Sequence, residues 1–96
     1  GSTITLKNNL IVGCPLGIAV KDAGSSVLID QNTIVNCGTG VAAYEKTFAS
    51  GGGRAIITNS IFSNCEQDIT NDSFSSITVA YSLSDTTLLL GTKNLL

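Results

Sequence analysis

The sequence predicts an all-β solenoid in which short parallel strands coil and stack, an arrangement known as a parallel β-helix. The first observation is a repeat: the stretch 6–20 recurs as 29–43, with its Asn, Ile, Cys and Gly each shifted by 23 positions. The second is that each repeat contains three short apolar segments separated by corner residues. The third is a chain that is 43% hydrophobic but only 5% aromatic, which suits a narrow cylinder filled with aliphatic layers. A fixed period in this range is the sequence signature of a solenoid.

The first repeat divides into three strands. Residues 2–8 alternate apolar and polar side chains, and an Asn pair then ends the strand because Asn tolerates left-handed backbone. A second strand covers 10–12, a corner with Gly and Pro follows, and a third strand covers 18–20. The polar segment 21–26 leads into the next repeat.

The later repeats follow the same order. The second has strands at 27–29, 33–35 and 40–43. Strands this short, without a two-residue Asn-Gly or Asp-Gly turn between them, do not form hairpins, and the glycines exclude helices. The third repeat begins at Ile56, and we predict one additional residue before its cysteine. A fourth begins in the alternating stretch 77–83, which gives about four turns of three short strands each.

Stacking places equivalent residues of successive turns in columns. We predict two aliphatic columns in the interior, an asparagine ladder whose amides bond along the stack, and a column of small buried thiols. These columns are Leu6/Ile29/Ile56, Ile11/Ile34/Ile61, Asn9/Asn32/Asn59 and Cys14/Cys37/Cys65. Neighbouring strands lie roughly 4.8 Å apart, so one disulfide between adjacent cysteines is an alternative to three free thiols. Lys7 and Asp30 are predicted neighbours forming a cross-strand ion pair, with Ile57 next in their column.

Composition excludes several classes of function. The net charge is −2 and no basic stripe is present, so nucleic acid and anionic membranes are poor partners. The chain has no His, which excludes His-based nucleophile systems and the commonest zinc ligand. The cysteine spacings match no zinc or redox motif, so we expect neither a metal nor a cofactor. Gly1 and Ser2 resemble a cloning remnant, which leaves 3–96 as a single domain and a fragment of a longer protein.

Several stretches are similar to known bacterial proteins. Three segments resemble the last coils of bacterial right-handed parallel β-helix repeat proteins of the pectate-lyase-like kind. These segments are 59–64 with 68–69, 76–84 and 91–94. Segments 17–22 and 40–46 resemble β-helix regions beside CotH-type kinase-like and lamin-tail domains in large secreted bacterial proteins. The resemblance implies a right-handed coil, in agreement with the handedness of parallel crossovers, and an extracellular or cell-surface location. It implies no single activity, because such repeats occur in polysaccharide lyases, glycoside hydrolases, adhesins and spacers.

An insertion over 44–53 interrupts the period and carries the densest mixture of charged and aromatic residues. Insertions in solenoids become loops on one face, and three consecutive glycines make the base of this loop flexible. The candidate ligand-binding residues are Tyr44, Glu45, Lys46, Phe48 and Arg54. Tyr44 and Phe48 are suited to stacking on a sugar ring, although the simpler interpretation is that they cap the core.

Catalysis would need a particular set of charged groups. A polysaccharide lyase needs a basic residue, and a hydrolase needs two carboxyl groups roughly 5 to 9.5 Å apart. The candidates are Lys21, Asp22, Glu45, Lys46 and Arg54, and the first two pairs follow equivalent strands, so we expect them on one edge. The simpler interpretation is that they are solvated loop charges.

The sequence therefore predicts a non-catalytic structural or carbohydrate-binding module of a secreted or cell-surface bacterial protein. The alternative is a fragment of a polysaccharide lyase or glycoside hydrolase of the β-helix type. Solenoid ends expose unpaired backbone and apolar layers, so self-association through open ends is expected. A polysaccharide is the expected ligand class, and no membrane insertion is expected because no apolar run approaches the roughly 20 residues that span a bilayer.

Overall fold

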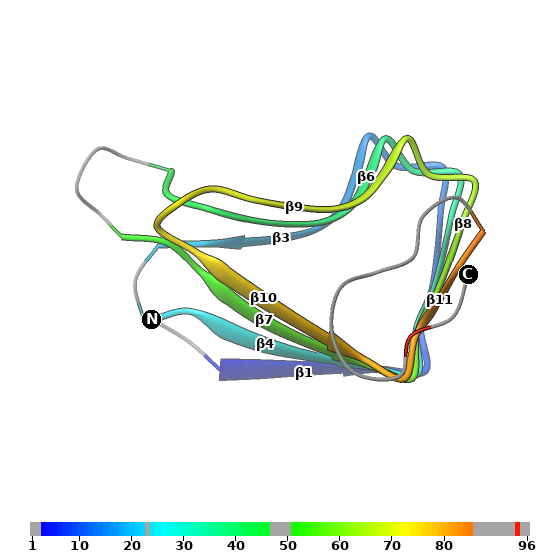
Figure 1. The fold of residues 1–96 in the computed structure, drawn as a ribbon, viewed down its shortest axis with the longest axis horizontal. Helices are drawn as coiled ribbons and strands as arrows, with labels where there is room; N and C mark the ends of the chain where they lie inside the picture. The colour runs from blue at the N-terminus through cyan, green and yellow to red at the C-terminus, as the bar shows by residue number, and fades with distance from the viewer. Residues whose placement is uncertain (1–2, 23, 47–50, 86–93, 95–96) are drawn as a thin grey trace.

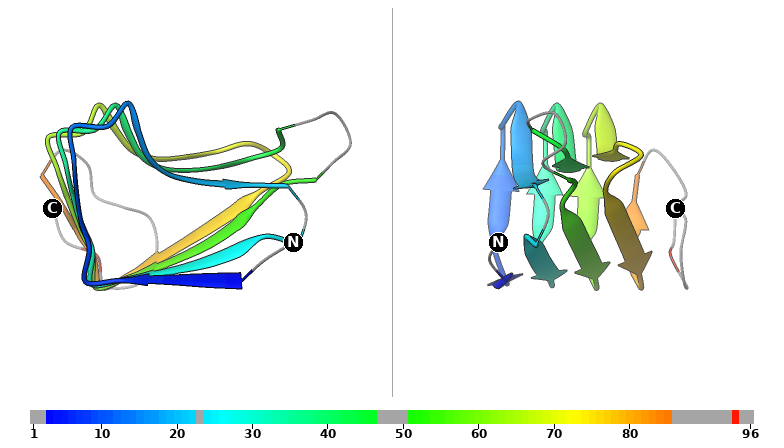
Figure 2. Two further views of the ribbon diagram at one scale, coloured as in Figure 1. Left: turned by 180° about the vertical axis from the view of Figure 1, so that it is seen from behind. Right: turned by 90° about the vertical axis from the view of Figure 1, so that its left-hand side faces the viewer.

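The computed structural model describes residues 3–22, 24–46, 51–85 and 94. Within these residues the chain forms eleven strands that assemble into three sheets, and every pair of neighbouring strands is parallel. Figure 1 looks along the stack, so equivalent strands overlap, and the right-hand view of Figure 2 shows the layers side by side. None of the described residues belongs to a helix long and apolar enough to cross a membrane.

Each sheet collects one strand from each of the first three turns, and within the described residues sheets A and B gain a fourth strand from the last turn. Sheet A contains β1 (Thr3–Lys7), β4 (Ser26–Asp30), β7 (Arg54–Thr58) and β10 (Ser76–Ala80). Sheet B contains β2 (Leu10–Val12), β5 (Thr33–Val35), β8 (Ile61–Ser63) and β11 (Leu83–Ser84). Sheet C contains β3 (Leu16–Lys21), β6 (Thr39–Tyr44) and β9 (Gln67–Asn71). Three strands per turn and wholly parallel pairing are consistent with the predicted solenoid.

The strand register gives the length of each turn. Leu6 lies opposite Ile29, Ile29 opposite Ile57, and Ile57 opposite Val79, so the successive offsets are 23, 28 and 22 residues. The longer second offset coincides with the segment between β6 and β7, where the sequence predicted an insertion.

The third turn begins one residue later than the sequence indicated. Ile57 and Phe62 face the interior and are 0% exposed, whereas the predicted core residue Ile61 is 42% exposed. Ile56 pairs with Leu28 in an outward-facing column, not with the interior residue Ile29. A slip of one residue moves every side chain of a strand to the opposite face, which explains both errors. Because the 28-residue offset continues from Cys37 to Cys65, the predicted additional residue before that cysteine does not exist.

The alternating stretch 77–83, which begins the predicted fourth turn, is interrupted by a corner. β10 ends at Ala80, Tyr81 turns the chain with a φ of 54°, and β11 begins at Leu83. The corner residues of the preceding layers have the same left-handed backbone: Asn8 (59°), Gln31 (57°) and Asn59 (51°). Asn59 is therefore a corner residue and not a rung of the asparagine ladder.

The asparagine ladder continues through serine in the third turn. The Asn32 Oδ1 accepts the Asn9 backbone N–H at 2.9 Å, and the Asn32 Nδ2 donates to the Leu6 carbonyl at 2.8 Å. Ser60 occupies the next rung, because its Oγ accepts the Asn32 backbone N–H at 3.3 Å. These side chains satisfy buried backbone groups at the corner, where strand pairing cannot do so.

Asn94 repeats the bonding pattern of Asn32 at the far end of the ladder. Its Oδ1 accepts the Ser82 backbone N–H at 2.9 Å, and its Nδ2 donates to the Val79 carbonyl at 3.2 Å. The Ser82 Oγ in turn accepts the Ser60 backbone N–H at 3.2 Å. Asn94 therefore supplies a further rung, one layer beyond β10.

The cysteine column is present, and its three thiols are free. Cys37 and Cys65 are buried, whereas Cys14 is half-buried. Each Sγ donates to the carbonyl two residues before it, at 3.7, 3.5 and 3.7 Å in chain order. Burial raises the pKa of the Cys65 thiol.

The first layer leaves apolar side chains exposed. Ile4 begins a column that continues with Val27 and Ala55, and its exposed fraction is 50% compared with 8% and 0% for those two. Leu6 is half-buried, whereas its neighbour Ile29 is 0% exposed. Among the described residues, β1, β2 and β3 are edge strands, so no layer covers their outer side.

Candidate functional site

Three connections between sheets C and A gather at one edge of the structure, at the left of Figure 1. We call this the loop edge; its described residues are 22, 24–25, 45–46, 51–53 and 72–75. Lys21 lies opposite Tyr44, and the Asp22 backbone N–H donates to the Tyr44 carbonyl at 3.2 Å. The Lys46 backbone N–H donates to Asp22 Oδ1 at 3.1 Å, so these neighbouring loops lie together, as expected from equivalent strand ends.

The aspartates of the loop edge hold backbone groups. Asp72 accepts the Glu45 backbone N–H at 2.7 Å through Oδ2. Its Oδ1 accepts the Phe74 backbone N–H at 3.1 Å and the Ser75 hydroxyl at 2.8 Å. The Glu45 N–H is the largest of the influences that lower the pKa of Asp72. This carboxylate therefore fixes the start of the insertion loop against the next turn.

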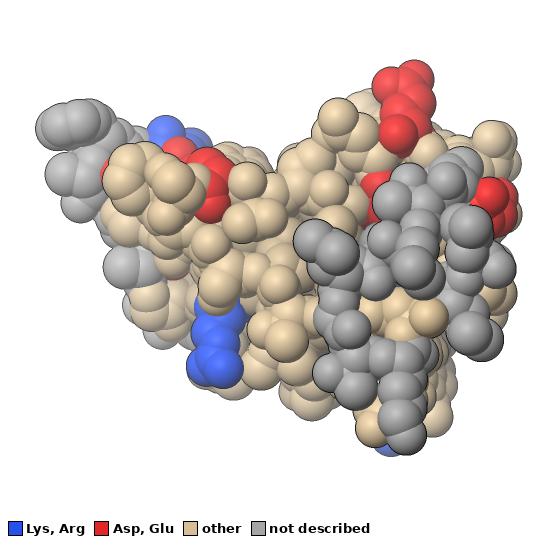
Figure 3. Space-filling model, in the orientation of Figure 1, with Lys and Arg blue, Asp and Glu red and all other residues tan. Residues whose placement is uncertain are grey.

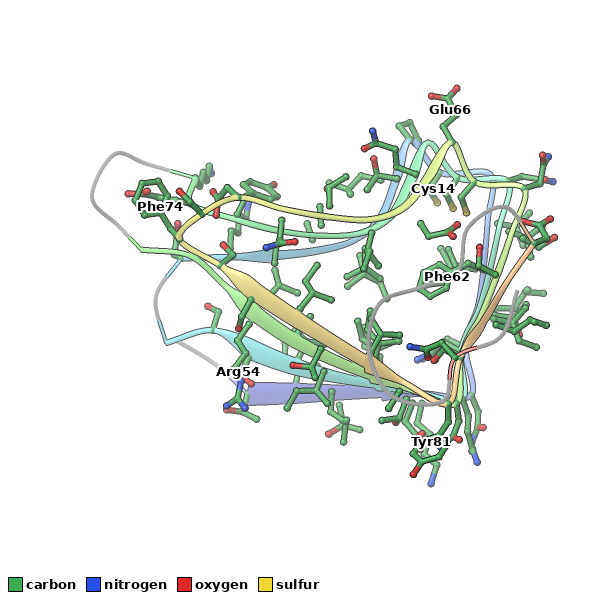
Figure 4. The ribbon with its side chains drawn as sticks, in the orientation of Figure 1. Cys14, Arg54, Phe62, Glu66, Phe74 and Tyr81 are labelled. Carbon is green, nitrogen blue, oxygen red and sulfur yellow. The ribbon has the colours of Figure 1, made fainter. Side chains whose placement is uncertain are left out.

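The residues predicted to bind a ligand do not all meet at the loop edge. Tyr44 and Glu45 are half-buried, and Lys46 is exposed. Arg54 is exposed at the start of β7, where it pairs with Ser26 and Ser76, and Figure 4 shows it on the outer side of sheet A, away from Phe74. Phe48 lies outside the described residues.

Phe74 is an exposed aromatic residue that the sequence reasoning missed. Its side chain is 65% exposed, and it lies on the loop edge. Gly52 lies against the backbone of this turn, since a Cβ at Gly52 would fall 2.2 Å from the Phe74 carbonyl oxygen. The sequence signal that could have revealed Phe74 is an aromatic residue inside the otherwise polar turn 72–75.

Figure 3 shows the surface hollowed between the loop edge and the ridge that carries Glu66, which is labelled in Figure 4. The outward column of sheet C that runs between them consists of Ala19, Ala42 and Thr70. Ala42 faces outward by strand alternation yet is only 7% exposed, which is consistent with a concave surface. Small floor residues between raised borders suit an extended ligand such as a glycan chain.

The charged groups at the loop edge are poorly suited to hydrolysis as they stand. Asp22 and Asp72 are both engaged with backbone N–H groups of the insertion loop. Asp68 is buried with an exposed fraction of 6% and accepts the Ser84 hydroxyl inside the coil, where an external substrate does not reach it. The described residues contain no group of three or more His, Cys, Asp or Glu side chains that could hold a metal ion.

A second polar arrangement lies at the corner between sheets A and B. Lys7 and Asp30 are neighbours as predicted, but the next residue in their column is Thr58, not Ile57. The Asp30 Oδ1 accepts the Asn59 Nδ2 at 3.1 Å and the Thr58 hydroxyl at 2.8 Å. The Asn59 amide makes the largest contribution to lowering the pKa of Asp30, and the charge of Lys7 makes a smaller one. We call the residues 7–8, 30–31, 58–59 and 80–81 the corner row.

Comparison with known proteins adds no relative. No family model matches the chain, and neither a curated protein nor a solved structure matches it.

Proposed function

We propose that this chain is a non-catalytic structural module, a right-handed parallel β-helix of about four turns from a secreted or cell-surface bacterial protein. Right-handedness rests on the strong bias of parallel crossover connections. The bacterial and extracellular assignment rests on the sequence resemblance alone. The module acts by stacking: its first layer receives another β layer, which a second copy of the chain supplies in solution.

The exposed first layer is the observation that carries this proposal. On sheets A and B the interior aliphatic side chains of the first layer are more exposed than their counterparts in the second, as Ile4 and Val27 illustrate with 50% and 8%, whereas Ile18 on sheet C is buried. The same layer presents the unpaired backbone edges of three strands. Exposed edges and apolar side chains in one plane are what a further β layer would cover.

The size of this end face sets the strength of association. The first layer is seen in the left-hand view of Figure 2, and its outline lies within 35 × 24 Å. The three-sided outline fills only part of this rectangle, so a stacked pair buries less than the roughly 800 Å² per partner of a standard interface. An interface of this size predicts an association that depends on protein concentration.

Sedimentation velocity over a range of protein concentrations tests the proposal. We expect the average mass to rise with concentration, and Ile4→Lys to weaken association by at least about tenfold because a lysine would be buried without a partner. Leu10→Lys is the matched control, since Leu10 belongs to the same layer but is 69% exposed. Equal effects of the two substitutions, or a monomer at all concentrations, would contradict stacking through this end.

Carbohydrate binding is the second candidate function, and the hollow of sheet C favours it. Phe74 lies at the loop edge, which borders this hollow, and Tyr44 ends β6 beside that edge, so both offer aromatic surfaces for sugar rings. Binding to a glycan array that is abolished by Tyr44→Ala would support this function.

The catalytic alternative is a fragment of a polysaccharide lyase. It predicts cleavage of uronate polysaccharides, which is measured by the ultraviolet absorbance of the unsaturated product.

A further inference from the structure

An exposed tyrosine ends the row of amide side chains at the corner between sheets A and B. Tyr81 occupies the position that Asn8, Gln31 and Asn59 hold in the earlier layers. The Asn59 backbone N–H donates to the Ala80 carbonyl at 3.2 Å, so Tyr81 and Asn59 lie in directly adjacent layers. The Tyr81 side chain is 55% exposed, and Figure 4 shows it projecting away from the body of the protein.

The backbone at this position is unfavourable for a tyrosine. Tyr81 has a φ of 54°, in the left-handed region that Asn adopts more readily than a bulky side chain. Its large exposed fraction shows that core packing gives little compensation for this conformation. The corner imposes this conformation in all four layers, so the distinctive feature of the last layer is an exposed aromatic ring where an amide would be less strained, and such a ring is available to stack on a ligand.

Polar groups of the two preceding layers lie in the same row as the ring. The Asn59 amide belongs to the adjacent layer, and the Asp30 carboxylate lies one layer further. Among the described residues, the Thr58 hydroxyl and the Asn59 amide both donate to Asp30 Oδ1, so Oδ2 can accept a hydrogen bond from a ligand. Two layers correspond to roughly 10 Å, so a ligand that contacts both Tyr81 and Asp30 must be longer than one sugar ring.

We propose that the corner row binds a neutral oligosaccharide that runs along the stack. One sugar ring stacks on Tyr81, and hydroxyl groups of the next residues bond to the Asn59 amide and the Asp30 carboxylate. An aromatic face combined with a few oriented polar groups is the usual composition of such a site. A uronate chain is disfavoured because its negatively charged carboxylates would be repelled by the Asp30 carboxylate. This site is separate from the loop edge and independent of stacking through the first layer.

Isothermal titration calorimetry with cellohexaose, glucose and hexagalacturonate tests the proposal on the whole chain. Cellohexaose is expected to bind, whereas glucose and hexagalacturonate are expected to give no measurable heat of binding. Tyr81→Asn should weaken cellohexaose binding by at least about tenfold. The same variant should raise the melting temperature by about 5 °C, because Asn relieves the left-handed strain. Weaker binding together with a higher melting temperature shows that the variant has lost a binding group and not its fold.

Two further variants serve as controls. Tyr81→Phe keeps the aromatic face and should retain affinity within about threefold. Tyr44→Ala alters the end of β6 beside the loop edge and should leave cellohexaose binding unchanged, so failure of the corner-row proposal is distinguishable from failure of the carbohydrate site near the loop edge. The proposal is overturned if cellohexaose does not bind, if Tyr81→Asn binds it as the unaltered chain does, or if that variant is less stable.

Discussion

The register of the third turn can be tested by a pair of adjacent alanine substitutions. Ile57 is 0% exposed and lies between Ile29 and Val79 in the interior, whereas Ile56 belongs to the outward column with Leu28. Removing a fully buried isoleucine side chain costs about 2 to 5 kcal/mol, through lost burial and the cavity left behind. A half-exposed isoleucine on a sheet surface should cost under about 1 kcal/mol.

The difference between the two variants is large relative to the total stability of the domain. A domain of 96 residues has a free energy of unfolding of roughly 5 to 14 kcal/mol. Ile57→Ala should therefore lower the melting temperature by at least about 8 °C, and Ile56→Ala by a few degrees at most. Thermal melts followed by circular dichroism measure the two melting temperatures. Urea denaturation gives the free energy of unfolding of each variant, and a shared m-value checks that unfolding is two-state. A larger loss for Ile56→Ala than for Ile57→Ala would refute the register.

Three further outcomes are expected. Asn32→Ala should lower the free energy of unfolding by about 2 to 4 kcal/mol, measured in urea, because the Leu6 carbonyl and a backbone N–H lose their partner. The pKa of Asp72 lies below its ordinary 3.8, so its stabilising contribution is complete above that pH and is lost as the pH falls through the lowered pKa. Asp72→Asn should accordingly flatten the acid limb of stability against pH, and an unchanged limb would contradict the contact with Glu45. In the folded protein, iodoacetamide should label Cys14 well before Cys65, whose thiol is buried with a raised pKa; mass spectrometry showing equal rates would contradict the buried column.

Local sequence signals located every strand of the first two turns, although β3 and β6 are longer than the predicted strands at 18–20 and 40–43. The strands at 10–12 and 33–35 were predicted with their observed bounds, because corner residues flank each apolar triplet. The stacking of Asn9 on Asn32 followed from the unbroken 23-residue period, since equal spacing along a coil places like residues in adjacent layers. The convergence of the loops after β3 and β6 followed from the same equivalence.

The candidate site was less accessible from sequence. The prediction grouped Arg54 with Tyr44 because they flank the same insertion, but the two residues belong to strands of different sheets. Phe74 comes from the following turn, and only stacking brings its loop beside Gly52. Proximity along the chain does not report which face of a coil a side chain occupies.

The sequence by itself determined the repeat, the three strands of each of the first two turns and an apolar interior, because each depends on periodicity and on residues that bend the chain. Only the tertiary structure decided the register beyond the insertion, since two alignments that differ by one residue both place an apolar side chain in each column, Ile56 or Ile57 in one and Ile61 or Phe62 in the other. Phe62 enters the interior and Ile61 faces solvent because the backbone pairing of β5 with β8 is set by the whole layer, not by either residue alone.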